Sequence, residues 1–227
     1  MNSSGLDLLL FVVLPYVAIA LFFIGAGFRY FVRPFSVSSL SSQFLENRLH
    51  FWAEVPFHYG LLVVLAGHLL AFLFPGTLLL FVSEPLRLFT LEAFALASGL
   101  VTLLGVTMII GRRATNAKVL AISTSMDWVL YLLLFIQISS GIWVAIFHSW
   151  GSFWFASVLT PYMRSLFAFD PAFLPVISLP LMAKLHLICG VCILALLPFT
   201  RLMHVLVAPL QYLFRKPQVV RWYSNTN

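Results

Sequence analysis

Residues 182–204 read MAKLHLICGVCILALLPFTRLMH, an apolar stretch with one histidine near each end, His186 and His204. The two histidines are 18 residues apart. At 3.6 residues per turn this separation is five turns, so an uninterrupted helix would place both imidazoles on one face. The rise between them would be about 27 Å, close to the thickness of the hydrocarbon layer of a membrane, about 30 Å. The stretch therefore predicts a membrane-crossing helix with one imidazole near each surface.

The composition of the whole chain excludes a soluble domain. Of the 227 residues, 62% are hydrophobic and 9% are charged, and so much apolar surface needs lipid around it. The formal net charge of +6 does not indicate nucleic acid, because the basic residues gather at the ends of apolar runs. The two cysteines, Cys189 and Cys192, lie inside the quoted stretch. A disulfide framework is therefore excluded, and apolar packing is favoured over a redox role.

Five apolar runs have the length of about 20 residues that a helix needs to cross a bilayer. They cover residues 8–28, 52–74, 89–111, 126–147 and 181–203. The first has no basic segment before it and is long enough to span, so we expect no cleavable signal peptide. Lipid offers the backbone no hydrogen-bond partners, so each run should be helical. The sequence predicts an all-α integral membrane protein with one domain over residues 1–227 and a tail at 204–227.

Lysine and arginine are distributed unequally over the two ends of these runs. One side has only Arg87, Arg164 and Lys184. The other side has ten basic residues: Arg29, Arg33, Arg48, Arg112, Arg113, Lys118, Arg201, Arg215, Lys216 and Arg221. The positive-inside rule places the larger group in the cytoplasm. We therefore expect a multi-pass protein of the cell inner membrane, with its N-terminus outside and its C-terminus cytoplasmic. The outer connections at 75–90 and 151–180 are expected to lie along the membrane surface.

Four of the six histidines fall into two pairs. His58 lies in the inner part of the second span and His68 in its outer part. The fifth span runs the opposite way, so His186 should face His68 and His204 should face His58. A lone histidine in a membrane helix is more often a packed polar residue, but neutral imidazole is also the common nitrogen ligand of haem iron. The two pairs predict two b-type haems stacked across the membrane.

The spacing of these pairs is unequal. His58 and His68 are about 15 Å apart along a helix and differ by about 80° around it, against about 27 Å for the other two histidines. Tilt and a bend at Pro198 would absorb part of the difference. His50 and His148 fall at span ends and are expected to be interfacial. Three glycines near the paired histidines are candidate haem contacts, although helix packing explains them equally well: Gly60, Gly67 and Gly190.

With these residues assembled, the chain resembles the gamma subunit of respiratory membrane-bound nitrate reductase, the cytochrome b that anchors that complex. The resemblance covers nearly the whole chain, with five spans in the same order. It rests on FHYGLLVVLAGH at 57–68, GRRATNAKVLAISTSMD at 111–127, LHLICGVCILALLPFTRLMHVLVAP at 185–209 and YLFRKPQVVR at 212–221.

The resemblance implies that the protein oxidises a membrane quinol, menaquinol or ubiquinol, at its outer face in anaerobic respiration. Electrons would pass inward through two b haems to an iron–sulfur beta subunit, and then to a molybdenum alpha subunit that reduces nitrate. By position, His68 and His186 would bind the outer haem iron, and His58 and His204 the inner one. Arg112 is a further candidate haem contact.

The quinol site implied by the resemblance contains Arg87, where family members usually carry lysine, together with His68. Arginine can donate to a quinone oxygen but cannot carry a proton. We expect His68 to hold iron with one ring nitrogen and to leave the other free for the quinone.

The cytoplasmic tail, with Arg112 and Arg113, is expected to dock on a partner subunit.

Two alternatives stay open at this point. The chain could be a related cytochrome b of another quinol-linked complex, such as one linked to sulfite reductase or heterodisulfide reductase. It could also be a membrane anchor or transporter without a cofactor. The terminal acceptor does not touch this subunit, so only the identity of the partner subunits would distinguish the first alternative from a nitrate reductase. An optical spectrum would show whether haem is present and so test the second alternative.

Overall fold

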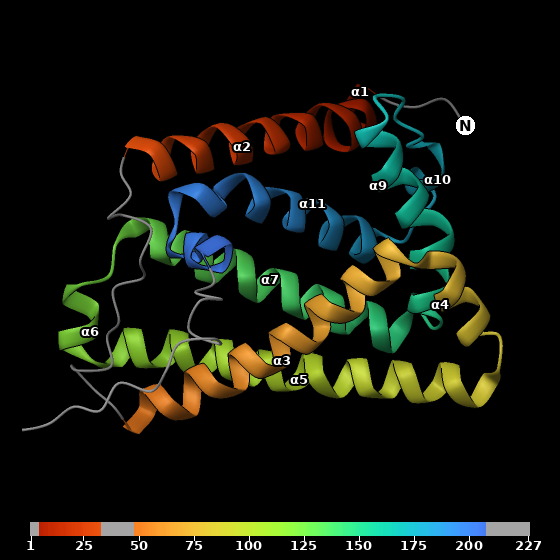
Figure 1. Cartoon of the computed structure of the whole chain (residues 1–227). Coiled ribbons are helices and arrows are strands. Elements are labelled where there is room, and N and C mark those ends of the chain that lie inside the picture. The colour runs from red at the N-terminus through yellow and green to blue at the C-terminus, as the bar shows by residue number, and fades with distance from the viewer. Residues whose placement is uncertain (1–4, 33–47, 208–227) are drawn as a thin grey trace, which may run out of the picture.

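The computed structural model describes residues 5–32 and 48–207 of the chain. In these ranges the regular structure is helical, and five segments are long and apolar enough to cross a membrane (Figure 1). They are Gly5–Val32, Phe51–Leu73, Pro85–Thr115, Ser125–Phe147 and Leu181–Phe199. The predicted all-α class and all five spans are confirmed, while the orientation of the termini in a membrane stays a prediction.

The first span comprises three consecutive elements: α1 (Gly5–Leu8), the π-helical turn η1 (Leu9–Val13) and α2 (Leu14–Val32). The middle of the chain forms α3 (Arg48–Leu73), α4 (Pro75–Phe81), α5 (Pro85–Thr115), α6 (Ala117–Ala121) and α7 (Ser125–Phe147). The last third forms α8 (Gly151–Trp154), the π-helical turn η3 (Phe155–Leu159), α9 (Thr160–Phe167), α10 (Leu174–Ile177), α11 (Leu181–Leu196) and the 3-10 turns η4 (Leu197–Phe199) and η5 (Arg201–Val207).

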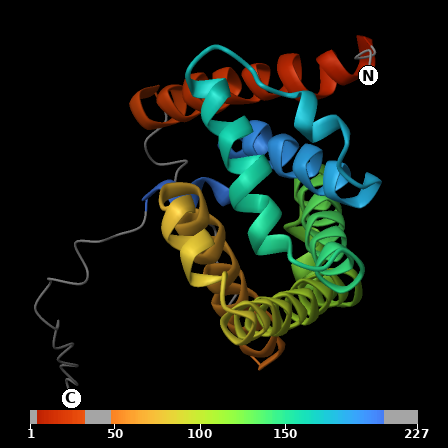
Figure 2. The same ribbon diagram turned by 90° about the vertical axis from the view of Figure 1, so that its right-hand side faces the viewer.

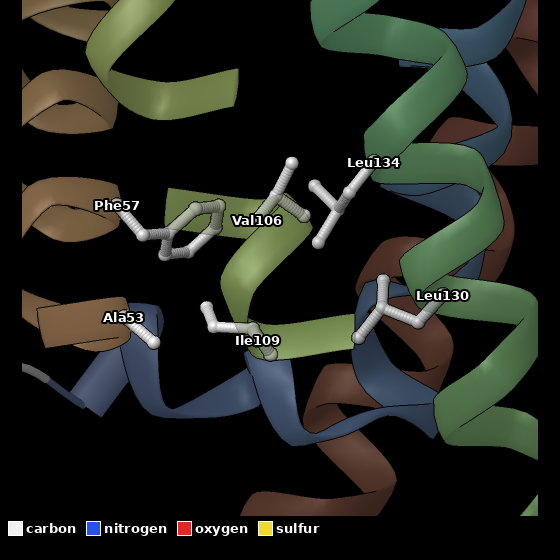
Figure 3. Packing of buried hydrophobic residues seen from close by; sticks show 6 residues of the cluster. All are labelled: Ala53, Phe57, Val106, Ile109, Leu130 and Leu134. Carbon is white, nitrogen blue, oxygen red and sulfur yellow. The ribbon is translucent and has the colours of Figure 1, made fainter. Parts of the chain in front are cut away.

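The long helices pack as an open ring in the order α3, α5, α7, α11, α2 (Figure 2). Among the described residues, α3 and α11 do not pack extensively on each other. Helices α3 and α5 approach closely at Gly105, where an added Cβ atom would lie 2.6 Å from the Cα of Phe57. Small residues permit such close approach in membrane helices. The main core lies where α3, α5 and α7 meet (Figure 3) and contains Ala53, Phe57, Val106, Ile109, Leu130 and Leu134.

A helical segment, α8–η3–α9, crosses one end of the bundle and ties several helices together. We call this end, which also holds α4 and α10, the α9 end, and the opposite one the α6 end (Figure 1). The Tyr162 hydroxyl donates to the carbonyl of Phe11 at 2.7 Å, and Arg164 donates to the carbonyl of Phe72 at 2.6 Å. Leu159, Tyr162 and Leu166 are buried with Phe11 and Val176 in a second core. The segment 151–180, which was predicted to lie along the membrane surface, therefore packs with one of its sides over this end of the bundle.

The fifth span is broken near Pro198. Helix α11 ends at Leu196, Thr200 is extended with φ −118° and ψ 179°, and η5 follows in a new direction. Proline lacks the N–H that would continue the helix, so a break here is expected. Arg29 donates to the carbonyls of Pro198 and Thr200 at 2.8 and 3.0 Å, which satisfies backbone groups that the break exposes. The bend expected at Pro198 is confirmed and amounts to a break in the helix, so the rise of about 27 Å for a regular helix over 182–204 no longer applies.

Candidate functional site

The structure brings together both predicted pairs of histidines. The ring centroids of His58 on α3 and His204 on η5 are 6.3 Å apart, with an interplanar angle of 55°. The centroids of His68 on α3 and His186 on α11 are also 6.3 Å apart, with an angle of 33°. Because η5 turns away from the line of α11, the unequal spacing along the two helices is no obstacle to either pair.

This separation suits one metal ion between two imidazoles. Metal–nitrogen bonds of about 2 Å on each side place the ring centroids roughly 6 Å apart. Within the described ranges, no group of three or more His, Cys, Asp or Glu residues converges as a bare metal ion would require. A site with two protein ligands fits a metal that brings its other ligands with it, as haem iron does with its porphyrin.

All four histidines have the tautomer that such a ligand needs. The Nδ1 atoms of His58, His68, His186 and His204 lie 2.8, 2.8, 2.9 and 2.6 Å from the backbone carbonyls of Glu54, Val64, Gln137 and Arg201, respectively. A carbonyl oxygen only accepts, so Nδ1 carries the proton in each ring and Nε2 keeps its lone pair. Ligating histidines usually donate their other N–H in this way. The residues would therefore suit two haem irons, each held by one pair of histidines through Nε2.

Three residues of helix α7 that the sequence did not single out lie around His186. The Gln137 side-chain amide lies 3.1 Å from His186 Nε2, and the Ser140 hydroxyl lies 3.2 Å from Nδ1. A Cβ atom on Gly141 would lie 2.8 Å from the His186 Cε1, so this glycine makes room for the ring. The signal in the sequence was the polar and small run QISSG at 137–141 within an apolar span.

The candidate glycines have different surroundings. Gly60 faces α5, where an added Cβ would lie 2.8 Å from the carbonyl oxygen of Ser98, so helix packing explains it. Gly67 has open space around the corresponding position, and Gly190 is in ordinary contact with Gln137 at 3.5 Å. Space for a flat group beside the backbone is therefore present at Gly67, next to His68. Haem contacts at all three glycines stay predictions.

Arg87 lies in an apolar cleft where α4 meets α5. The cleft has a volume of about 370 Å³ and is lined by Phe81, Leu86, Arg87, Thr90, Leu91 and Phe94. The Arg87 guanidinium stands over the ring of Phe81 at 5.7 Å from its centroid. His68 is not among the lining residues that the structure describes. The expectation that its second ring nitrogen is free is wrong, because Nδ1 bonds to the Val64 carbonyl.

The two arginines at the end of α5 are not exposed. Arg112 and Arg113 are only 4% and 5% accessible. Arg113 donates to the Ser123 hydroxyl at 2.8 Å and lies 3.8 Å from the Asp127 carboxylate. The prediction that these two side chains contact a partner subunit directly is therefore wrong, because the guanidinium groups are buried within the chain. A haem contact by Arg112 stays a prediction.

Other predicted features lie at the margins of the structure. The tail beyond Val207 and the side chain of His50 fall outside the described residues. His148 caps the C-terminal end of α7, in agreement with its predicted place at a span end. Cys189 and Cys192 are free thiols, as expected.

Comparison with known proteins places this geometry in a family. The family described as "Nitrate reductase gamma subunit" matches residues 7–223. The chain belongs to this family. It is 30% identical over 213 residues to the nitrate reductase gamma chain of Bacillus subtilis, covering 92% of this chain and 95% of that one. It is 31% identical over 223 residues to the respiratory nitrate reductase 2 gamma chain of Escherichia coli, covering 95% and 97% of the two chains.

A longer relative contains the same region. The chain is 32% identical over 212 residues to the nitrate reductase-like protein NarX of Mycobacterium tuberculosis, covering 91% of this chain. It spans only 32% of the length of that protein. The resemblance inferred from the motifs is confirmed by these matches, and the five long apolar helices agree with a multi-pass membrane protein of this family.

Proposed function

We propose that this chain is the cytochrome b subunit of a quinol-oxidising nitrate reductase and holds two b haems. The observation that supports this most strongly is the repeated geometry of the histidines. Two pairs, His58–His204 and His68–His186, have the same centroid separation of 6.3 Å, and in all four rings Nδ1 donates to a carbonyl. Three of the four Nδ1 bonds are local to one helical turn, so the main support is that two pairs of rings from separate elements have the same separation.

The protein contributes ligation and spacing. The Nε2 atoms of each pair would bind the iron of one haem, and the backbone carbonyls would hold the rings in place. A bound b haem supplies the ability to accept and release one electron at a time. The two pairs share α3, with His58 and His68 ten residues apart, which is a rise of about 15 Å. The α3 backbone therefore sets the distance between the two sites.

The cleft at Arg87 is the proposed place of quinol oxidation. The cleft is open, and three of its six lining residues, Phe81, Leu86 and Phe94, are exposed apolar side chains. A quinol is apolar except at its two oxygens, so an apolar cleft with one cation matches its chemistry. Arg87 would donate to a quinol oxygen and orient the ring. It would not take up a proton, because guanidinium keeps its charge, so protons would leave to water at the α9 end.

The proposed partners are an iron–sulfur beta subunit and, through it, a molybdenum alpha subunit. The relatives named as gamma chains of nitrate reductases support this proposal. Partners would bind at the α6 end, which carries most of the basic residues and is the proposed cytoplasmic side. Truncation after Tyr212 should release the partner subunits from membranes while the haem content stays; partners that remain bound would contradict docking by the tail.

An optical spectrum of the purified protein tests the proposed function. We expect a b-type alpha band in the reduced-minus-oxidised spectrum, and a pyridine haemochrome assay should give about two haems per chain. A Soret band that is absent would favour an anchor or transporter. Haem without reduction by quinol would favour a cytochrome b with a different donor.

A further inference from the structure

His204 is the only one of the four paired histidines that is not carried by a long helix. It lies on η5, a 3-10 segment of seven residues, Arg201–Val207, beyond the break at Pro198. His58 and His68 share α3, and His186 lies inside α11. A short segment after a break has few backbone hydrogen bonds to hold it. Some other interaction must therefore fix where the His204 ring stands.

A chain of contacts from α7 provides this anchor. The carboxylate of Asp127 accepts a hydrogen bond from Arg201 Nε at 2.9 Å. The same guanidinium donates through Nη2 to the carbonyl of Ile122 at 3.1 Å. The backbone carbonyl of Arg201 in turn accepts from His204 Nδ1 at 2.6 Å. Asp127 thus holds the residue whose carbonyl orients the imidazole.

The Asp127–Arg201 contact has the features of a strong interaction. Asp127 is only 4% accessible, and a hydrogen bond between two charged groups is about twice as strong as a neutral one. Asp127 is itself fixed, because its other oxygen accepts from the backbone N–H of Thr124 at 3.0 Å in a capping box at the start of α7. The anchor of η5 is therefore tied to the rigid end of a long helix.

We infer that Asp127 and Arg201 are positioning residues for the haem bound by His58 and His204, and that they act on this haem alone. The inference rests on the proposed function. The contacts described for the His68–His186 pair come from other residues, namely Val64 and Phe155 for His68 and Gln137, Ser140 and Gly141 for His186. The second haem of the same molecule is therefore an internal control.

The test is Asp127→Asn in the full chain, purified from membranes with its haems. The amide keeps the shape and can still accept from Thr124 but loses the charge that binds Arg201. We expect the affinity for the His58–His204 haem to fall about 10-fold to 100-fold, as for other groups that orient a metal ligand. Its low-spin electron paramagnetic resonance signal and its reduction potential should shift. The other haem should keep its signal and its content.

Thr124→Ala is the matched control. It removes the hydroxyl that accepts from the Asp127 N–H at 3.2 Å and so weakens the helix cap, but it leaves the carboxylate on Arg201. Both haems should stay as in the wild type. Arg201→Lys is the second variant. Lysine keeps the positive charge but lacks the planar guanidinium that binds the Asp127 carboxylate and the Ile122 carbonyl at the same time. It should shift the same haem in the same direction, by less.

The outcomes separate this inference from the proposed function. Wild-type protein without haem would overturn the proposed function and this inference with it. Wild-type protein with two haems and an unchanged Asp127→Asn variant would overturn this inference alone. If Asp127→Asn loses both haems, Arg201→Lys decides: a selective shift of the His58–His204 haem supports positioning, and equal effects on both haems overturn it.

Discussion

The imidazoles of His68 and His186 face each other with their centroids 6.3 Å apart, although the helices that carry them, α3 and α11, are not packed neighbours in the ring. The two helices are joined through α5 and α7, because α3 packs on α5, α5 on α7 and α7 on α11. A second pair repeats this relationship at the α6 end, between α3 and η5. The two histidine pairs along α3 therefore have the same separation between their rings.

His186→Ala should remove one haem and leave the other. The pairing predicts that the pyridine haemochrome assay falls from about two haems to about one per chain, with the His58–His204 signal retained. His68→Ala should have the same effect, since both residues serve one site. His148→Ala, which changes a histidine at the end of α7 outside both pairs, should keep both haems. Selective loss of the other haem would show that the pairs are crossed.

Gln137→Ala should strengthen haem binding at the His68–His186 site. The Gln137 amide donates to His186 Nε2, the atom that iron would need, and its own Oε1 is buried without a hydrogen-bond partner among the described residues. Removing a competing hydrogen bond of about 1 kcal/mol should raise the affinity about fivefold. The carbonyl of residue 137, which orients the ring, is unchanged. Haem titration of the apoprotein measures the effect, and weaker binding would contradict it.

Gly141→Ala should weaken the same site. The new methyl group would lie 2.8 Å from His186 Cε1 and 3.2 Å from Nδ1, so the ring must move. A shift of the ligand should lower haem occupancy there by about 10-fold, in the range seen when metal ligands are misoriented. Gly111→Ala is the control, because no atom lies within 4 Å of the added carbon. Equal occupancy in both variants would show that the close approach at Gly141 has no role.

Arg87→Ala should slow the reduction of haem by quinol without loss of haem. The guanidinium would donate to a quinol oxygen, and a hydrogen bond from a charged group is worth about 1.5–3 kcal/mol. Quinone-analogue inhibitors should then bind about 10-fold to 100-fold less tightly. Arg87→Lys keeps the charge and should lose less. Stopped-flow reduction and inhibitor titration measure both effects, and unchanged values would rule out Arg87 and favour a quinol site in the 149–180 loop.

The position of the cleft was foreseeable in part. Arg87 follows a short apolar connection and precedes a long span, so a cation at a membrane surface was evident from the sequence. Its partners were not, because Phe81 reaches the guanidinium only through the turn between α4 and α5.

Arg113 shows the opposite case. Its place in a basic cluster suggested an exposed group, but the fold surrounds it with Ser123, Asp127 and Tyr131.

The five spans and the pairing of the histidines could be predicted from the sequence alone. Hydropathy is a local average over about 20 residues, and lipid leaves such a run only the helical conformation. Successive spans alternate in direction, so the order of the histidines along two antiparallel spans already determined which should meet. The match of the motifs to the gamma-subunit family depended on the same local strings of residues.

Only the tertiary structure decided how the pairs are held. The break at Pro198 removes the long regular helix that the spacing implied, and Arg29 and Arg201 stabilise the new path through contacts with residues far away in the chain. His58, His68 and His204 bond to carbonyls of their own helical turn, three or four residues earlier, but for His186 the carbonyl that fixes the protonated nitrogen belongs to Gln137, 49 residues earlier. A hydrogen bond is directional and needs its partner within about 3 Å, so periodicity along one segment cannot reveal it.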